Sequence, residues 1–332
     1  MEIYYPGYYH AFHCIASACP DSCCQDWAVD VDPQSAKAYR ALSGALGDKL
    51  RDVLKDTDSG TIMQIENGRC PMWQTDGLCR IHAELGHEAL CKTCRQFPRL
   101  VHDYGNFQEL GLELSCPEAA QLILSSASCS FHSQTQPGGE PPEYLPEDMA
   151  LLRQSRETAL HFLENSPFSL PETLAILLIY SHGIQGQLDG GNDIPFDAAA
   201  CLVAAKKLAK AGDMASVFHF FQQLEILTPS WKNRLSLPPK QINWVPELRA
   251  LMRYMLQRYW LQTIADYDLI GRVKLAVIAC LLVGAMGENT IQTAQLFSKE
   301  IENDPDNVEA ILAGAYASPA FTDTNLLSLL LT

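Results

Sequence analysis

The sequence predicts a mainly α protein in two parts: a cysteine-rich N-terminal domain with little β structure and an all-helical C-terminal domain. Ten of the twelve cysteines lie in the first 129 residues, whereas one apolar helical pattern follows another from residue 147 onward. Between these regions, residues 130–146 are rich in Pro, Gly, Ser and Gln and show no periodicity, which is typical of a linker. We therefore expect a metal- or cluster-binding domain at 1–129, a linker at 130–146 and a helical domain at 147–332.

In the first domain, Asp32 and Pro33 have the residue types that cap and begin a helix, and an imperfect apolar stripe continues to Lys55. The other predicted elements of this domain are a short strand at 61–65, a short helix at 81–90 interrupted at Gly86, a hairpin at 104–114 and a helix at 117–126. None of these elements predicts a βαβ unit.

The second domain is predicted to be helical throughout. The predicted helices are 147–165, 171–181, 196–211, 214–227, 246–267, 272–286, 290–303 and 308–316. Cys201 and Cys280 lie inside two of these apolar patterns. We expect both to be core residues that act as small hydrophobic side chains.

Composition and charge restrict the compartment and the partners. The 332 residues, 47% apolar and 19% charged, are enough for a substantial buried core. A net charge of −15 argues against a nucleic-acid partner, which requires a basic face. The first residues show no secretory signal, and the apolar run at 275–286 is too short to span a bilayer, so it predicts a buried helix. We expect a cytoplasmic protein without a transmembrane segment, in which cysteines bind metal rather than form disulfides.

The densest chemical signal is a group of four thiols within eleven residues, formed by Cys14, Cys19, Cys23 and Cys24. Closely spaced thiolates bind soft metals and iron–sulfur clusters. The spacing C-x4-C-x3-C-C differs from the C-x2-C knuckles of a zinc ribbon and from the C-x3-C-x2-C loop of radical S-adenosylmethionine enzymes. It therefore predicts a metal or cluster without selecting which one.

Five further cysteines of the first domain are candidate metal ligands: Cys70, Cys79, Cys91, Cys94 and Cys116. Cys91 and Cys94 form a C-x2-C knuckle, whose two thiols can reach one ion at little conformational cost. A redox dithiol is the alternative, but such a pair usually begins a helix within a βαβ unit. Nine thiols suit one four-cysteine centre with additional thiols, or two centres.

Arg95 and Arg99 directly follow this knuckle. Positive charge beside thiolates stabilises an anionic cluster, and an arginine can bind a carboxylate through two hydrogen bonds. Both are therefore candidate cofactor-binding residues, with surface salt bridges as the alternative. The sequence contains no phosphate-binding loop, dinucleotide fingerprint, nucleophile elbow or H-E-x-x-H motif.

Several blocks, in order along the chain, resemble the flagellin lysine-N-methylase family of bacteria, which is related to a broader group of zinc- or iron-chelating CxxCxxCC domains. The blocks are FHC at 12–14, DSCC at 21–24, CP at 70–71, DGLCRIH at 76–82, LCKTCRQFPR at 90–99 and LSCPEAA at 114–120. The resemblance covers about residues 1–128. The helical remainder has the expected length and composition but carries no motif.

The resemblance implies a cytoplasmic enzyme that transfers a methyl group from S-adenosylmethionine to lysine side chains of flagellin before export. It also implies that the cysteines hold an oxygen-sensitive 4Fe–4S cluster, with zinc as the alternative metal. Peripheral membrane association and a homo-oligomer are compatible with it. The helical domain is then expected to shape the groove for the protein substrate.

A lysine ammonium, with a pKa of about 10.4, must lose a proton before its nitrogen attacks a sulfonium. Asp21, Asp26 and Tyr104 are candidate proton acceptors because they lie near the cysteines in the sequence. Polar and radical methyl transfer both stay open. Two other functions also stay open: a zinc-stabilised protein-binding module and an iron–sulfur redox protein.

Overall fold

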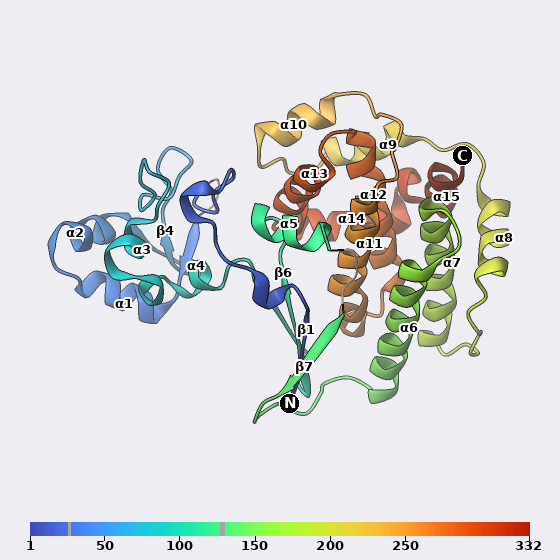
Figure 1. The fold of residues 1–332 in the computed structure, drawn as a ribbon, viewed down its shortest axis with the longest axis horizontal. Coiled ribbons are helices and arrows are strands. Elements are labelled where there is room, and N and C mark those ends of the chain that lie inside the picture. Colours follow the sequence, from blue (N-terminus) through green and yellow to red (C-terminus); the bar gives the residue numbers. More distant parts are fainter. Residues whose placement is uncertain (26–27, 127–129) are drawn as a thin grey trace.

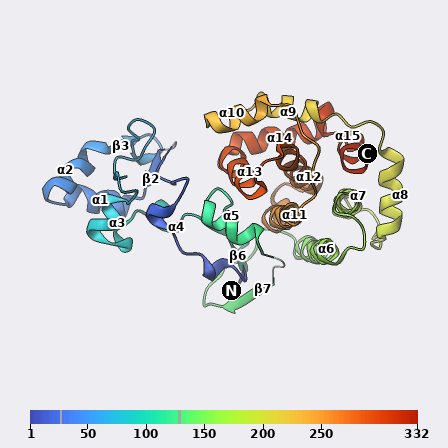
Figure 2. The same cartoon turned by 45° about the horizontal axis from the view of Figure 1, so that its top comes forward.

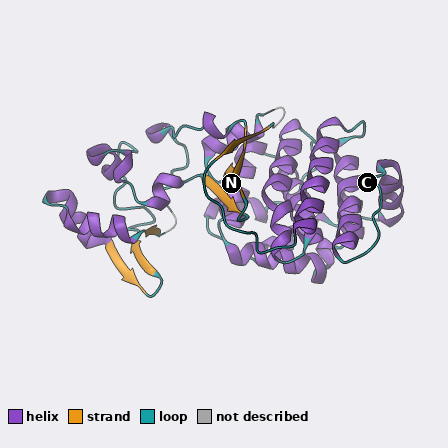
Figure 3. Cartoon of the chain, turned by 90° about the horizontal axis from the view of Figure 1, so that it is seen from below, coloured by secondary structure: helices purple, strands orange, loops and turns teal. Residues whose placement is uncertain are grey.

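The structure is a computed structural model that describes residues 1–25, 28–126 and 130–332, so the candidate Asp26 lies outside the described residues. The described residues form seven strands: β1 (Glu2–Pro6), β2 (Val29–Val31), β3 (Leu54–Thr57), β4 (Gly60–Met63), β5 (Arg99–Asp103), β6 (Phe107–Leu112) and β7 (Phe131–Thr135). The α-helices are α1 (Pro33–Ala41), α2 (Gly44–Val53), α3 (Arg80–Leu85), α4 (Lys92–Gln96), α5 (Pro117–Leu124), α6 (Pro146–Asn165), α7 (Leu170–Leu188), α8 (Ala198–Leu208), α9 (Met214–Gln222), α10 (Pro229–Ser236), α11 (Pro246–Tyr259), α12 (Leu269–Met286), α13 (Thr290–Phe297), α14 (Pro305–Ala317) and α15 (Asp323–Leu331). The protein is mainly α, as predicted (Figure 3).

Two hydrophobic cores divide the chain into a small lobe and a larger body (Figures 1 and 2). The cysteine lobe, defined as β2 through α4, packs around residues such as Tyr39, Leu50 and Met72. The body combines α5–α15 with the sheet that contains β1, and one continuous core joins Leu112 and Ile123 to the long helices. The boundary between the two cores therefore differs from the boundary at residue 129 that the cysteine distribution predicted. Helix α5 and the sheet that contains β1 belong to the body and not to the cysteine lobe.

The body contains a four-stranded sheet of order β5-β6-β1-β7. In it, β1 pairs in parallel with β6 and antiparallel with β7, and β5 pairs antiparallel with β6. The lobe contains an antiparallel sheet of order β2-β4-β3. Strand β7 lies inside the stretch that was expected to be an irregular linker. Local composition does not reveal this strand, because its partner β1 is more than a hundred residues away.

The predicted helices of the body are largely present, and most differences lie at helix ends. The predicted helix at 33–55 is instead two helices, because the chain is extended at Leu42 and Ser43 and Gly44 has a positive φ of 82°. The prediction also missed α10 and α15. Their N-caps are Thr228 and Thr322, whose side chains each accept a backbone N–H of the first turn.

Helix α12 is the central element of the body. It is the one helix among the described residues that is long and apolar enough to cross a membrane, but 94% of it is buried inside the fold. The apolar run at 275–286 is therefore a buried helix, as predicted. Cys280 on this helix is fully buried, whereas Cys201 on α8 is half-buried.

One buried ion pair links the sheet to the helices. Arg156 of α6 donates to Glu109 of β6 through both terminal nitrogens, one of them at 2.7 Å. The two side chains are only 10% and 8% exposed. Taking two charges out of water is costly unless both remain paired, so this contact holds the sheet at one position against the helices.

A second polar contact holds the C-terminal helix and gives a stability prediction. Lys274 of α12 and His182 of α7 both lie within 3.1 Å of the Asp323 carboxylate at the start of α15. Burial acts to raise the pKa of Asp323, but these two neighbours outweigh it and lower the pKa to about 2.

Because the pKa of Asp323 is lower in the folded protein than the usual value of about 3.9, the ionised group stabilises the fold above that value. This stabilisation is lost as the pH falls toward 2. We expect the wild type to lose about 2 kcal/mol more unfolding free energy than Asp323→Asn between pH 5 and pH 2. Urea unfolding at several pH values measures the difference, and parallel curves for the two proteins would contradict it.

Candidate metal centre

A cavity of about 340 Å³ lies where the cysteine lobe meets the body, and thiols line much of it. Three separate parts of the chain form its walls: the segment at 12–24, the lobe, and the start of α5. Seven of the nine predicted ligands line it: Cys14, Cys19, Cys23, Cys24, Cys79, Cys94 and Cys116. The other two, Cys70 and Cys91, are buried and hydrogen-bonded to Cys24 and Cys94, respectively. The structure therefore brings all nine thiols into one region.

Three of these cysteines occupy the N-cap position of a helix: Cys79 for α3, Cys91 for α4 and Cys116 for α5. None of these three side chains accepts a capping hydrogen bond from the described residues. The nearby N–H groups of the first turn act to lower the pKa of each thiol, but burial outweighs them at Cys79 and Cys116, whose pKa is raised. The sequence predicted a helix that begins at Pro117, where Pro is common, and so placed Cys116 directly before it. The cap positions of Cys79 and Cys91 were not predicted.

Hydrogen bonds between thiols determine which sulfurs ionise most readily. Hydrogen bonding from Cys23 and Cys70 to Cys24 lowers the pKa of Cys24 and raises the pKa of Cys23 and Cys70. Cys94 donates to Cys91 and lowers the pKa of Cys91 to about 7. Thiolate is the form that binds metals. Cys24 and Cys91 are therefore the sulfurs best prepared to act as ligands.

The donor chemistry of the cavity fits a soft metal or an iron–sulfur cluster, since thiols dominate and the imidazoles of His13, His82 and His87 stand beside them. Within the described residues, however, no three His, Cys, Asp or Glu side chains converge on one point as metal ligands do. The thiols surround a space instead. Metal binding at a thiol site is coupled to folding of the segments that carry the ligands.

Both predicted cofactor-binding arginines line this cavity. Arg95 donates to the backbone oxygen of Glu88 at 3.2 Å and lies 3.6 Å from its carboxylate. Arg99 lies with its guanidinium 5.2 Å from the ring centre of Phe12. Arg99 makes no ion pair within the described residues, so its charge is available to a ligand in the cavity.

A second pocket, of about 510 Å³, adjoins the cysteine cavity and shares Cys23, Phe97 and Arg99 with it. Its far side carries two carboxylates from distant parts of the chain, Glu113 and Glu302. Sequence reasoning missed both, because no local signal connects residues so far apart.

The two carboxylates of this adjoining pocket have different surroundings. Glu302 lies in the π-helical turn after α13 and accepts hydrogen bonds from Tyr254 and Tyr259, with Arg258 beside it at 3.3 Å. The Glu113 carboxylate accepts only from the Ser115 hydroxyl among the described residues, at 3.3 Å. Burial raises the pKa of Glu113. Glu302 is thus held in a network, whereas Glu113 is the less engaged of the two.

Two of the three proton acceptors predicted from the sequence, Asp21 and Tyr104, lie within the described residues. Asp21 lines the cysteine cavity, but its carboxylate already accepts from Gln25, Gln295 and Lys299 at 2.6, 2.8 and 3.1 Å. It therefore ties the cysteine segment to the body. Tyr104 lies in a different cavity, and burial raises its pKa. Sequence proximity to the cysteines did not place Tyr104 beside them.

A redox dithiol, the alternative interpretation of Cys91 and Cys94, usually begins a helix and lies within a βαβ unit, and the described residues show only the first of these two features. The pair does begin a helix, α4, contrary to the expectation from the sequence. The lobe sheet is antiparallel, however, so the described part of the lobe has no βαβ unit around the pair. The hydrogen bond from Cys94, with the nearby N–H groups of the helix start, explains the lowered pKa of Cys91 without a thioredoxin-like fold.

Fold and site together define a mainly α protein with a thiol-rich cavity between two lobes. Comparison of sequences then identifies its relatives. Flagellar biosynthetic protein FliU of Salmonella muenchen is 36% identical over 127 residues, which are 36% of this chain and 75% of FliU. Lysine-N-methylases of Salmonella choleraesuis and Salmonella typhimurium are 37% and 35% identical over 127 residues. The chain belongs to the flagellin lysine-N-methylase family.

The similarity is confined to part of each protein. The matched stretch spans 32% of each Salmonella lysine-N-methylase and about a third of this chain. No family model matches the chain, and no solved structure matches it. The names of the matched relatives support a methyltransferase-like role for the matched stretch.

Proposed function

We propose that this protein is an S-adenosylmethionine-dependent lysine N-methyltransferase that acts on flagellin in the cytoplasm, with an iron–sulfur cluster held by cysteines of the cavity. The observation that carries the proposal is the gathering of seven thiols from three chain segments around one cavity, in a family whose relatives are named lysine-N-methylase. When bound, a cluster supplies redox capacity and Lewis-acidic iron beside the methyl donor. Cys24 and Cys91 are the first ligands we assign to it.

Other residues of the two pockets would act on the substrates. Arg95 and Arg99 line the cysteine cavity and can hold the carboxylate of the methionyl part of the donor. We assign the adjoining pocket to the lysine side chain, because two carboxylates line it and one of them, Glu113, is held by a single side-chain hydrogen bond. In polar transfer the lysine nitrogen attacks the methyl carbon, the methyl–sulfur bond breaks, and S-adenosylhomocysteine leaves. Glu113 accepts the proton that the ammonium gives up.

The test of the proposal is anaerobic purification of the full chain, followed by iron, sulfide and zinc analysis and an assay with methyl-labelled S-adenosylmethionine and flagellin. Iron with sulfide and labelled lysine in flagellin support the proposal. Zinc with no methyl transfer would instead indicate the zinc-stabilised binding module. Iron and sulfide without binding of S-adenosylmethionine would indicate the redox protein.

The proposed role of Glu113 gives a separate prediction. Glu113→Gln is expected to lower kcat about a hundredfold, which is the smaller end of a general-base contribution. Only the ionised carboxylate accepts a proton, so the wild-type rate should rise with pH through a pKa above the usual glutamate value of about 4.3, because burial raises it.

The pH profile of kcat for both proteins checks this role. The variant should lose the rise in rate that the wild type shows through the pKa of Glu113. Gln121→Glu, on the exposed face of α5, is a matched control for a change between amide and carboxylate and should leave kcat unchanged. An unchanged profile in Glu113→Gln would assign the proton to another acceptor.

A further inference from the structure

Strand β5 is an edge strand of the body sheet, and one side of its backbone is open. Alternate residues of β5 hydrogen-bond to β6. The Glu113 N–H donates to the Pro98 carbonyl and the Tyr104 N–H donates to the Phe107 carbonyl, so in this register Leu100 and His102 are the residues of β5 whose backbone groups face β6. The N–H and C=O groups of Arg99, Val101 and Asp103 therefore face away from β6. Within the described residues, nothing else hydrogen-bonds these backbone groups.

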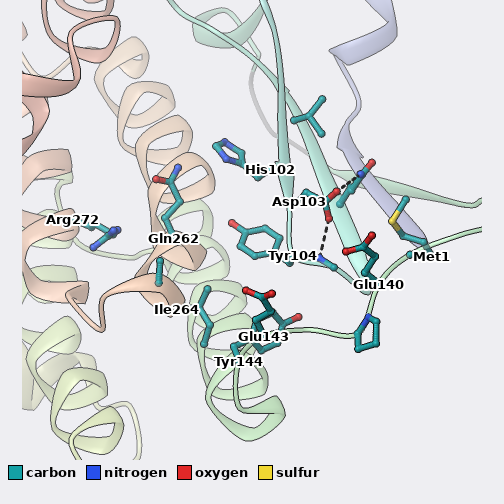
Figure 4. A pocket seen from close by; sticks show the side chains of 16 residues that line it. Met1, His102, Asp103, Tyr104, Glu140, Glu143, Tyr144, Gln262, Ile264 and Arg272 are labelled. Carbon is teal, nitrogen blue, oxygen red and sulfur yellow. Dashed lines mark hydrogen bonds between the residues drawn. The ribbon is translucent and has the colours of Figure 1, made fainter. Parts of the chain in front are cut away.

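A cavity of about 1000 Å³ runs along this open edge (Figure 4). Five successive residues, Val101 to Gly105, line it, together with Met1 and Gln108. Since neighbouring side chains of a strand point to opposite faces, the cavity borders both faces of β5 and extends round the end of the sheet. Its volume is at the upper end of the range of roughly 300–1,000 Å³ for small-molecule pockets. It is therefore large enough for a segment of polypeptide.

The opposite wall of this edge cavity comes from the helices. Figure 4 shows Gln262 and Ile264, from the 3-10 turn η4 (Trp260–Ala265), and Arg272 of α12 across from His102 and Tyr104. Val101, in the middle of the strand, is 52% exposed, although it is a large apolar residue. An added strand would cover this side chain and satisfy the open backbone groups of β5.

The charges around the edge cavity favour a cationic segment. Asp103, Glu140 and Glu143 line it, and all three are exposed. Asp266 neutralises Arg272 through two nitrogens at 2.8 and 2.9 Å, whereas the Met1 ammonium donates to the neutral carbonyl of Gln136 and keeps its charge, so three carboxylates face one such cation. The unbalanced charge is therefore negative, in a protein whose net charge is −15.

The edge also leads to the thiol site. β5 begins at Arg99, which lines the cysteine cavity and the adjoining pocket, and ends at Asp103 in the edge cavity. At about 3.3 Å per residue, these two ends are about 13 Å apart. A strand laid along β5 thus enters from the acidic cavity and delivers its other end to the proposed methyl-transfer site.

We propose that the open edge of β5 binds an extended, lysine-bearing segment of the protein substrate as an added β-strand. The inference rests on the proposed function and specifies how its substrate is held. Backbone hydrogen bonds supply affinity without regard to sequence, and the carboxylates select lysine-rich segments. The substrate segment must accordingly be unfolded locally when it binds.

The test compares proline substitutions on the two edges of the same sheet. Val101→Pro removes the central outward N–H of β5 and leaves the pairing with β6 intact, because that N–H takes no part in it. Ser133→Pro is the matched control on β7, where the hydrogen-bonded pairs Gly7–Ser130 and Met1–Gln136 leave Ser133 facing outward. The probe is a fluorescein-labelled dodecapeptide of alternating lysine and threonine, and its binding is followed by fluorescence anisotropy.

Val101→Pro is expected to weaken probe binding about tenfold, as a lost central hydrogen bond and the distorted edge predict, while Ser133→Pro leaves it unchanged. A second variant that does not touch the sheet, Glu140→Gln with Glu143→Gln, should weaken binding severalfold at low salt and little at high salt. Equal binding by wild type and Val101→Pro overturns the inference, and so does a loss confined to Ser133→Pro.

Methyl-transfer assays separate this inference from the proposed function. Val101→Pro should raise KM for the lysine peptide about tenfold with kcat unchanged, since the edge holds the substrate but takes no part in the chemistry. Absence of methyl transfer in the wild type would refute the proposed function, while the anisotropy result would still decide whether the edge binds peptide.

Discussion

Replacing Cys24 with Ser is expected to remove most of the metal from anaerobically purified protein and to abolish methyl transfer. Cys24 lies at the centre of the thiol network, and hydrogen bonds from Cys23 and Cys70 lower its pKa. Loss of this thiolate removes a ligand, and folding of the lobe is coupled to the site. The unfolding free energy should therefore fall by well over the ~0.5 kcal/mol typical of surface substitutions.

The matched control is Cys280→Ala, at a fully buried cysteine in the core of the body. It should destabilise the fold through a lost sulfur but leave iron and sulfide content unchanged. Metal analysis and visible absorption distinguish the two variants. The metal assignment is contradicted if single substitutions at each of the six grouped cysteines retain full metal: Cys14, Cys19, Cys23, Cys24, Cys91 and Cys94.

Arg156→Met is expected to lower the unfolding free energy by about 3–5 kcal/mol, because it leaves Glu109 charged and buried without its partner. Adding Glu109→Leu to the same chain should restore most of the loss, since a buried ion pair replaced by apolar residues is often neutral. Urea unfolding of the two variants measures both effects. A small loss in Arg156→Met would mean that water reaches Glu109.

The exposed pair Arg40–Asp56 is the matched control for this experiment. The side chains of Arg40 and Asp56 are 41% and 70% exposed, although their charged atoms are only 2.7 Å apart. Arg40→Met should therefore cost at most about 1 kcal/mol. The difference between the two methionine variants isolates the effect of burial from that of the ion pair itself.

The helices of the body could be predicted because helix formation depends on residues three or four positions apart. The apolar pattern around Cys280 predicted a buried helix, and α12 is one. The Asp32-Pro33 pair predicted the start of α1, and Asp32 does accept the N–H of Ser35. Short helices such as α10 escaped, because eight residues with one apolar face give little periodicity.

The sequence by itself also determined the donor chemistry of the candidate site. Cysteine density and ordered motifs identified the nine thiols and the two arginines, and seven of the thiols and both arginines line one cavity. The residue types state which atoms can bind a soft metal. They contain no information about which sulfurs share a proton or which lie at helix N-caps.

Only the tertiary structure decided which distant residues meet. The carboxylates of Glu113 and Glu302 face one pocket, and Gln295 binds the backbone of Ser115 across 180 residues. Strand β7 exists because β1 pairs with it, and β5 has an open edge because the sheet ends there. Strand order and pocket walls arise from long-range packing of the whole chain, so no local pattern specifies them.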